Sequence, residues 1–294
     1  MAKKVHRCFC LPIIALRLIS LKFPFNFLLM IKQAIIPLAG LGTRMLPLTK
    51  AFPKELWPLG KKSILENILD ECFGAGIKQV IFVISDKKKL IKDYFRQNIS
   101  LETKVKNKPE LLRSLKNLNK ISSKIKFAYQ NKPKGLGHAV LCATSLIKSK
   151  HFLLLLPDDI IKGKNCSREL IAINKKTKSS VIALRKVIKK DVKRYGIVGF
   201  NNFKNFKINK MVEKPSVKNS PSQYAIIGRY ILNRSIFSYL AQQKGGKLGE
   251  IQITDAMNSM LAYENFYGCK FKGKYLDCGT INGYIKSFIE INKK

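Results

Sequence analysis

The sequence predicts an α/β fold built on a doubly wound, mixed and mostly parallel sheet. Two patterns indicate this fold. Short, almost wholly apolar segments alternate with segments whose apolar residues recur at helical spacing, as in successive βαβ units. The apolar segments also lack the polar alternation of a half-exposed strand, which is typical of parallel strands covered by helices on both faces. We therefore expect the functional site at the carboxyl ends of the strands.

The elements of the first half follow one another from residue 31. A strand over 31–38 leads into a glycine-rich loop, and a helix then begins at Ser63, which forms a capping box with Glu66. Apolar residues at helical spacing carry this helix as far as Gly74. The remaining expectations are strands over 80–84, 126–130 and 152–156, a helix over 88–95, and a polar, lysine-rich insertion near 100–124.

The second half carries three segments with the composition of strands, at 195–198, 212–215 and 226–230. We expect them to form a smaller β layer beside the cleft. The segment 249–256 then indicates the capped start of another helix. No internal repeat or long linker is visible, so a single domain over residues 30–294 is expected.

Residues 1–29 differ from the rest of the chain. Basic residues precede an apolar run over 8–20, which superficially resembles a signal peptide. Charged residues interrupt that run, no small-residue cleavage site follows it, and no segment approaches the roughly 18 apolar residues of a membrane span. We expect that translation begins at Met30 or that residues 1–29 are a dispensable extension, and we expect no membrane partner.

Composition places the chain among globular proteins, with 294 residues of which 46% are apolar. The net charge of +38 raises the possibility of a nucleic-acid-binding protein. The surplus is mostly lysine and is spread along the whole chain, whereas specific readers of phosphates and bases use arginine. We interpret it as lysine on solvated faces, which predicts weak, salt-sensitive binding to polyanions but no specific nucleic-acid partner.

The cysteines indicate a reducing compartment. Their number is odd, and no Cys-x-x-Cys spacing of a zinc site occurs. The seven cysteines are at positions 8, 10, 72, 142, 166, 269 and 278. We expect reduced thiols and a cytoplasmic location.

The loop over residues 39–55 has the chemistry of a phosphate-binding site. Gly40 and Gly42 allow backbone N–H groups to approach an anion, and Arg44 and Lys54 add cationic donors. The spacing excludes a dinucleotide fingerprint, which needs a third glycine or alanine, and a P-loop, which needs Gly-Lys-Ser/Thr. The loop therefore indicates a nucleoside triphosphate site.

This loop also resembles a known family. The pattern Gly-x-Gly-Thr-Arg-x-x-Pro over 40–47, followed by Pro53-Lys54, is similar to the signature of sugar-phosphate nucleotidyltransferases. The whole run 39–55 resembles that of the bacterial uridylyltransferases that use glucose 1-phosphate, and the resemblance extends over residues 31–290. It implies a Rossmann-like nucleotidyltransferase fold, UTP and glucose 1-phosphate as substrates, and a homodimer or homotetramer.

Two acidic residues at strand ends are the candidate metal ligands. Asp158 comes directly after a buried strand and Pro157, and Asp277 follows a short strand and precedes a helix. Two carboxylates beside a triphosphate suit Mg²⁺, which takes few protein ligands and completes its shell with phosphate and water. The resemblance assigns the metal to these two positions and not to the adjacent Asp159.

The resemblance also implies which residues bind each substrate. A glutamine amide offers a donor and an acceptor to the imide edge of uracil, so we expect Gln130 to bind the base. For His138 we expect a structural role. The family pattern places the nucleotide against Ala39, Gly40, Gly42, Thr43, Gln130 and Gly135, the sugar phosphate against Gly196, Glu213, Lys214 and Gly228, and the catalytic cations at Arg44, Lys54 and Lys214.

The implied reaction needs no base, because the attacking phosphate oxygen is already anionic. It would attack the α-phosphorus of UTP in line and expel pyrophosphate, with no covalent intermediate. Gln223-Tyr224 departs from the family pattern, which leaves the sugar contacts there open. Two alternatives remain: a thymidylyl- or cytidylyltransferase of the same fold, and a non-catalytic regulatory or polyanion-binding relative.

Overall fold

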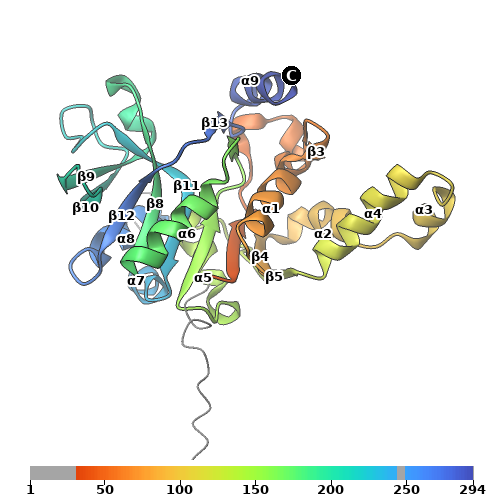
Figure 1. The fold of residues 1–294 in the computed structure, drawn as a ribbon, viewed down its shortest axis with the longest axis horizontal. Helices are drawn as coiled ribbons and strands as arrows, with labels where there is room; N and C mark the ends of the chain where they lie inside the picture. Colours follow the sequence, from red (N-terminus) through yellow and green to blue (C-terminus); the bar gives the residue numbers. More distant parts are fainter. Residues whose placement is uncertain (1–30, 244–248, 294) are drawn as a thin grey trace, which may run out of the picture.

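A nine-stranded sheet forms the centre of the computed structural model, which describes residues 31–243 and 249–293 (Figure 1). Expectations for residues 1–29 therefore lie outside the described residues. The sheet order is β5-β4-β1-β6-β11-β8-β12-β10-β9. In that order the strands are Ile125–Tyr129, Gln79–Ile84, Gln33–Pro37, His151–Leu155, Tyr224–Asn233, Ser180–Lys186, Phe266–Lys270, Lys207–Glu213 and Gly196–Asn202.

The sheet is mixed, as predicted. The pairs β5–β4, β4–β1, β1–β6 and β8–β12 are parallel, whereas every pair that involves β11, β10 or β9 with a neighbour in this order is antiparallel. Parallel pairing is thus concentrated in the half of the sheet that carries the glycine loop.

The expectation of a separate β layer beside the cleft is wrong. β9 and β10 continue the main sheet through β12, and β9 also pairs with β11 at Tyr224 and Val198, so this end of the sheet curls back on itself. Strand composition predicts a strand but not its pairing partner, which is chosen by contacts distant in sequence. Two short sheets pair β13 (Lys274–Asp277) with β7 (Asp159–Lys162), and β2 (Pro58–Leu59) with β3 (Lys62–Ser63).

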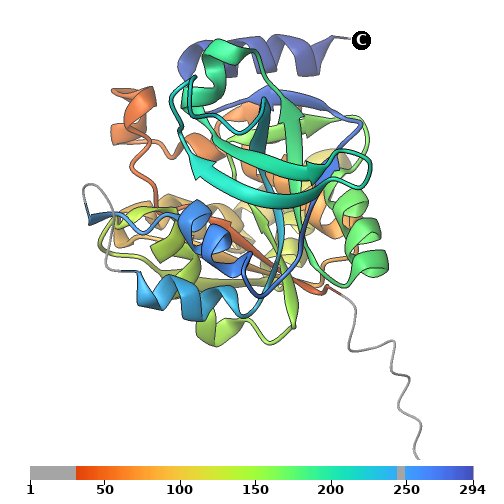
Figure 2. The same ribbon diagram turned by 90° about the vertical axis from the view of Figure 1, so that its left-hand side faces the viewer.

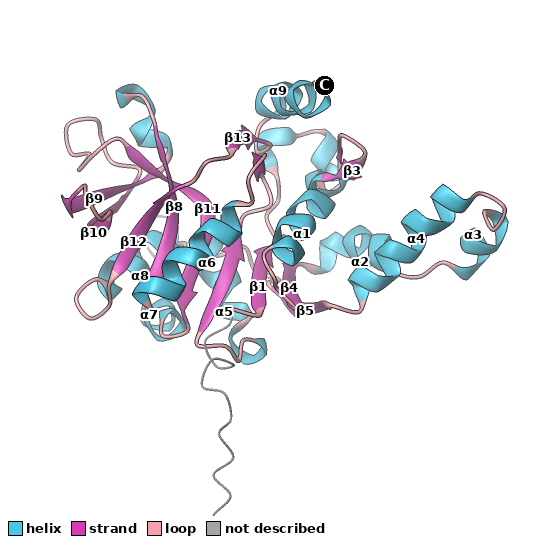
Figure 3. Ribbon diagram, viewed as in Figure 1, coloured by secondary structure: helices cyan, strands magenta, loops and turns pink. Residues whose placement is uncertain are grey.

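Helices cover both faces of the sheet (Figure 3). Along β1, Ile36 packs into the core on one face and Ile35 into the core on the other, as the alternation of a strand requires. The first core also contains α1 (Ile64–Gly74), α2 (Lys89–Phe95) and α6 (Cys166–Thr177). The second contains α5 (Gly135–Cys142), α7 (Ile236–Gln242) and α8 (Ile253–Met260).

The predicted helix starts differ in outcome. The capping box at α1 is confirmed, because Ser63 Oγ accepts from the Glu66 N–H and the Glu66 carboxylate accepts from the Ser63 N–H. The predicted side-chain cap of α8 is wrong, since Gln252 precedes the helix and no side chain caps it. The C-terminal helix α9 (Ile281–Asn292) lies across one end of the molecule (Figure 2).

The lysine-rich insertion folds as two helices, α3 (Ile99–Lys104) and α4 (Pro109–Ser122), which project from the body of the molecule (Figure 1). Sequence analysis did not predict them. The signal was a proline at the first helical position followed by leucines at helical spacing, in a segment dominated by lysine.

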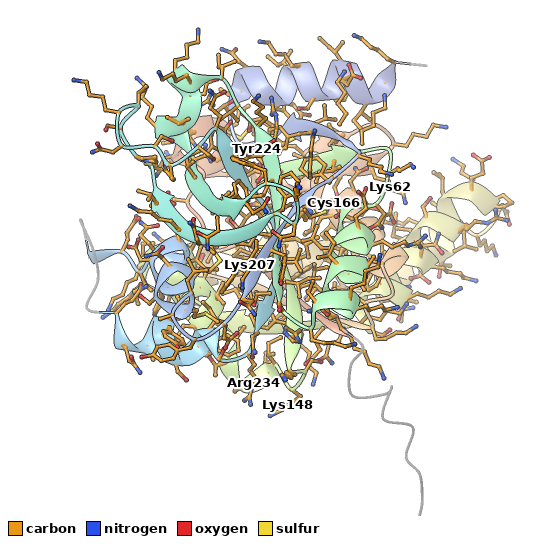
Figure 4. All side chains as sticks on the ribbon, turned by 60° about the vertical axis from the view of Figure 1, so that its left-hand side comes forward. Lys62, Lys148, Cys166, Lys207, Tyr224 and Arg234 are labelled. Carbon is orange, nitrogen blue, oxygen red and sulfur yellow. The ribbon has the colours of Figure 1, made fainter. Side chains whose placement is uncertain are left out.

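Lysine is distributed over the whole surface. In Figure 4, Lys148 and Arg234 lie close together near the lower end of the molecule, Lys207 lies near the centre of the view, and nitrogen-tipped side chains surround the outline. Among the described helices, none is both long enough and apolar enough to cross a membrane.

A buried ion pair connects α1 to β11. The Arg229 guanidinium has no exposed area and donates to both carboxylate oxygens of Glu71, at 2.9–3.1 Å. Burial alone would raise the pKa of Glu71, but the Arg229 charge and hydrogen bonds outweigh burial and lower it. Glu71 also accepts from the N–H and hydroxyl of Ser167 on α6, so the carboxylate joins three elements.

We expect Glu71→Gln to lower the free energy of unfolding by about 3–5 kcal/mol, because the buried guanidinium would lose its counter-charge. Asp70→Asn is the matched control, since it makes the same charge change one residue earlier. The ion pair of Asp70 with Lys62 is about half exposed, so its loss is expected to cost less than about 1 kcal/mol. Urea unfolding measures both variants, and equal losses would contradict the prediction.

Candidate active site

Two cavities meet at the carboxyl ends of β1 and β6, and both are lined by Arg44 and Asp158. The larger has a volume of about 570 Å³ and the smaller about 250 Å³. Of the predicted residues, the larger cavity holds Ala39, Gly40, Gly42, Thr43, Arg44, Lys54, Gln130, Gly135 and Asp158. The smaller holds Arg44, Asp158, Gly196, Glu213, Gly228 and Asp277.

Lys214 is the predicted residue that the structure does not bring into either cavity. Its side chain is 62% exposed, and its ammonium lies 3.8 Å from Glu213 Oε1. The backbone of Lys214 has a φ of 44°, in the left-handed region. The strand end therefore turns the lysine outward while Glu213 faces the smaller cavity.

Gly40 and Gly42 in the glycine loop have different structural roles. Gly42 has a φ of 67° and precedes a short 3₁₀ helix over Thr43–Met45, and Thr49 Oγ1 donates to its carbonyl. Gly40 has no heavy atom within 4 Å of the position where a Cβ would lie. Gly42 shapes the loop, and Gly40 leaves space against the larger cavity.

Asp158 holds both cations of the loop region. Its Oδ2 accepts from Lys54 Nζ at 2.7 Å and from Arg44 Nη2 at 3.1 Å. Burial acts to raise the pKa of Asp158, but the charges of Lys54 and Arg44 outweigh burial and hold it below its ordinary value. The carboxylate is therefore ionised at neutral pH.

Asp277 faces the same small space as Asp158. A Cβ on Gly279 would lie 2.9 Å from Asp158 Oδ2, 3.0 Å from Arg44 Nη2 and 3.2 Å from Asp277 Oδ1. Any side chain at this position would fill the space between the two carboxylates. Two carboxylate ligands with open positions fit a hard divalent cation that also binds phosphate. Among the described residues, no cluster of three or more acidic, histidine or cysteine ligands occurs.

Asp159 is occupied by contacts within the protein. Its Oδ2 accepts from the Gly228 N–H at 2.8 Å, and its Oδ1 accepts from the Tyr275 hydroxyl at 2.7 Å. Burial and the neighbouring Asp158 charge raise the pKa of Asp159 to about 6. The side chain thus fastens β11 and β13 to the turn after β6.

Gly228 contributes shape to the cavity and no free hydrogen-bonding group of its own. Its N–H donates to Asp159, and its carbonyl accepts from the Leu156 N–H and from Arg229. A Cβ at Gly228 would lie 2.5 Å from Leu156 Cβ and 2.5 Å from Asp159 Oδ2. Close packing therefore requires glycine here.

Several lining residues of the smaller cavity were given no role by sequence analysis, among them Arg194, Thr254 and Tyr275. Thr254 donates to Glu213 Oε2 at 2.8 Å, and this leaves Oε1 to face the cavity or Lys214. Thr254 lies in the segment 249–256, which sequence analysis interpreted only as a helix start. Arg194 directly precedes Tyr195-Gly196, and a cation beside the strand that the resemblance assigns to the sugar phosphate was the available signal.

The fold and this pair of cavities define a nucleotide-dependent α/β transferase, with the glycine loop in one cavity and acidic and cationic groups shared with the other. The family profile described as "Nucleotidyl transferase" matches residues 33–294, and the chain belongs to that family.

Relatives agree with this assignment. The chain is 38% identical over 266 residues to a putative UTP–glucose-1-phosphate uridylyltransferase of Methanocaldococcus jannaschii, covering 89% of this chain and 93% of the relative. It is 38% identical over 265 residues to the UTP–glucose-1-phosphate uridylyltransferase of Bacillus subtilis, covering 88% and 90%. A crystal structure of apo UDP-glucose pyrophosphorylase matches with a TM-score of 0.82 at 34% identity, covering 89% of this chain and 98% of the other. A UDP-glucose complex of such an enzyme matches with a TM-score of 0.79 at 34% identity, with the same coverage.

We expect Gly228→Ala to lower the free energy of unfolding by about 1–3 kcal/mol, since the methyl group would overlap Leu156 and Asp159. Gly40→Ala is the control, because the space around Gly40 is open and its backbone is not left-handed. Its stability is expected to stay within about 0.5 kcal/mol of the unmodified protein. Thermal or urea unfolding decides the matter, and an unchanged Gly228→Ala would refute the packing argument.

Proposed function

We propose that the protein transfers the uridylyl group of UTP to glucose 1-phosphate, giving UDP-glucose and pyrophosphate. The observation that carries this proposal is the meeting of the two cavities at Arg44 and Asp158. The larger cavity has the glycine loop and an amide for a nucleotide, and the smaller has Glu213 for sugar hydroxyls. The relatives described above, a UTP–glucose-1-phosphate uridylyltransferase and a UDP-glucose pyrophosphorylase with UDP-glucose bound, support the same reaction.

The chemical step follows from the charges at this junction. A phosphate oxygen of glucose 1-phosphate forms a bond to the α-phosphorus of UTP, and the bond from that phosphorus to the bridging oxygen of pyrophosphate breaks. Lys54 and Arg44 lie at the junction and stabilise the negative charge on the phosphates. The loop N–H groups position the triphosphate. Catalysis then consists of positioning and charge neutralisation.

We propose Mg²⁺ as the cofactor, held by Asp158 and Asp277, whose carboxylates border the space beside Gly279. When bound, the ion would neutralise phosphate charge that the protein's cations do not reach. For Lys214, pairing with the sugar phosphate stays a prediction, since its side chain lies outside both cavities in this structure.

We further propose a cytoplasmic homodimer or homotetramer. Cys72, Cys166, Cys269 and Cys278 are buried free thiols, which supports a reducing compartment. Exposed Leu48, Phe52 and Leu90 around one apolar groove support subunit contacts.

The proposed reaction is tested by pyrophosphate release from purified protein with Mg²⁺ and glucose 1-phosphate. UTP, dTTP, CTP, ATP and GTP are offered in parallel at moderate salt. We expect release with UTP well above the others. Pyrophosphate release with a different nucleotide would overturn the assignment of Gln130 to uracil. No release with any nucleotide would overturn the proposal that the protein is this enzyme.

We expect Lys54→Ala and Asp158→Asn each to lower kcat at least about 100-fold, the typical cost of removing one electrostatic stabiliser. Lys61→Ala and Asp70→Asn are controls of the same charge change at exposed positions, and they should retain activity. Near-normal kcat in either site variant would contradict the roles given to Lys54 and Asp158.

Removal of divalent ions with EDTA is expected to abolish turnover, and added Mg²⁺ should restore it. Asp277→Asn should lower kcat at least about tenfold and raise the Mg²⁺ concentration for half-maximal rate, because one of two carboxylate ligands is lost. A Mg²⁺ titration of both proteins measures this effect. An unchanged Mg²⁺ dependence would remove Asp277 from the metal site.

A further inference from the structure

Gln130 is a buried amide held directly beside the larger cavity. It follows β5, and its N–H donates to the Ile84 carbonyl, which extends the ladder between β5 and β4 by one bond. The residue is only 5% exposed, yet it contributes to the cavity lining. The orientation of its amide therefore decides which atom a bound base would meet.

The orientation of the amide follows from the chemistry of its neighbours. The Gln130 amide atom 3.0 Å from the Gly135 carbonyl must be Nε2, because a carbonyl oxygen only accepts. The same Nε2 lies 3.0 Å from His138 Nδ1. Since Gln130 Nε2 is a donor, His138 Nδ1 must be unprotonated. The neutral imidazole therefore carries its proton on His138 Nε2.

Both acceptors come from the first turn of α5. Gly135 and His138 are three residues apart and lie on the same side of the helix. This turn is fixed by close packing, because the Gly137 N–H donates to the Ile251 carbonyl and a Cβ at Gly137 would lie 2.6 Å from that oxygen. The two acceptors thus form a rigid support for the Gln130 amide.

Gln130 Oε1 is left as an accessible acceptor. Among the residues that the structure describes, none donates to it, since both side-chain hydrogen bonds of Gln130 use Nε2. Within the same ranges, the one buried side-chain nitrogen or oxygen without a partner is His151 Nε2. Gln130 Oε1 is therefore not buried, and the surface it reaches is that of the larger cavity.

We propose that His138 is a positioning residue that selects uracil over cytosine by holding the Gln130 amide with Oε1 toward the base. The inference rests on the proposed function. Uracil presents an N3–H donor to this acceptor, whereas cytosine presents a lone pair at N3 and would leave two acceptors facing each other. Thymine has the same N3–H as uracil, so the device acts equally on UTP and dTTP.

The histidine is neutral under ordinary conditions. Burial and the nearby Lys134 charge lower the pKa of His138 below its ordinary value, so Nδ1 is free to accept at neutral pH. Without this second acceptor the amide keeps one bond and gains freedom to turn. The specificity for uracil then depends on a side chain that does not itself contact the base.

The test compares His138→Leu, which has no acceptor, with His138→Asn, whose Oδ1 can take the place of Nδ1. The constant kcat/KM is measured with UTP, dTTP and CTP for both variants and the unmodified protein. We expect the UTP-to-CTP ratio to fall at least about tenfold in His138→Leu, with UTP and dTTP affected equally, and to stay within about threefold in His138→Asn. Most of the change should be in KM, since the reacting phosphates are untouched.

Cys142→Ala is the structural control, because Cys142 lies 3.9 Å from the His138 ring on the same helix but offers Gln130 nothing. Its UTP-to-CTP ratio should not change. The proposal would be overturned if the UTP-to-CTP ratio of kcat/KM did not change in His138→Leu. The same holds if kcat/KM fell by the same factor for UTP and CTP, because His138 would then be a packing residue. Failure of the unmodified protein to use UTP would instead overturn the proposed function itself.

Discussion

The buried contact between Arg229 and Glu71 is the constraint on which the cleft depends. A guanidinium without any exposed area is stable only when a counter-charge pairs with it and acceptors bind its N–H groups. Besides binding Glu71, Arg229 donates to the carbonyls of Leu156, Gly228 and Asp159. These carbonyls belong to the turn after β6, to β11 and to the start of β7. One side chain therefore fixes α1, β11 and the turn that carries Asp158.

The turn after β6 also determines the charge pattern of the site. Asp158 faces outward from it toward Lys54 and Arg44, while Asp159 faces back and is held by Gly228 and Tyr275. The two adjacent carboxylates thus have opposite environments, and their pKa values move in opposite directions. The hydrogen bonds of Arg229 to Leu156, Gly228 and Asp159 hold this turn and so keep the two carboxylates in their separate environments.

Much of this could be predicted from sequence, because it depends on local patterns. The apolar strands, the Ser63 capping box and the spacing of Gly40, Gly42 and Arg44 are read within a few residues. The network around Arg229 could not be predicted in this way. Its partner Glu71 is 158 residues distant, and neither residue carries a local signal of burial.

The errors have the same origin. The pairing of β9 with β11 is decided by contacts across the sheet, and the outward turn of Lys214 is decided by a single left-handed backbone position. Composition also indicated only a polar, lysine-rich insertion where α4 forms, since lysine obscured the leucine spacing. Helix formation there follows the positions of the apolar residues, whatever polar residue separates them.

The large positive charge and the site follow different rules. Lys54 is the one buried lysine among the residues that the structure describes, and its ammonium is paired with Asp158 at 2.7 Å. Most surface lysines are hydrated, and their attraction for phosphates is long-ranged, weak and screened by salt. Arg44, Lys54 and Asp158 together carry a charge of only +1, but they carry it in fixed positions and partly out of water. Fixed charges in such a site act on a developing phosphate charge without reorganisation, which hydrated lysines cannot do.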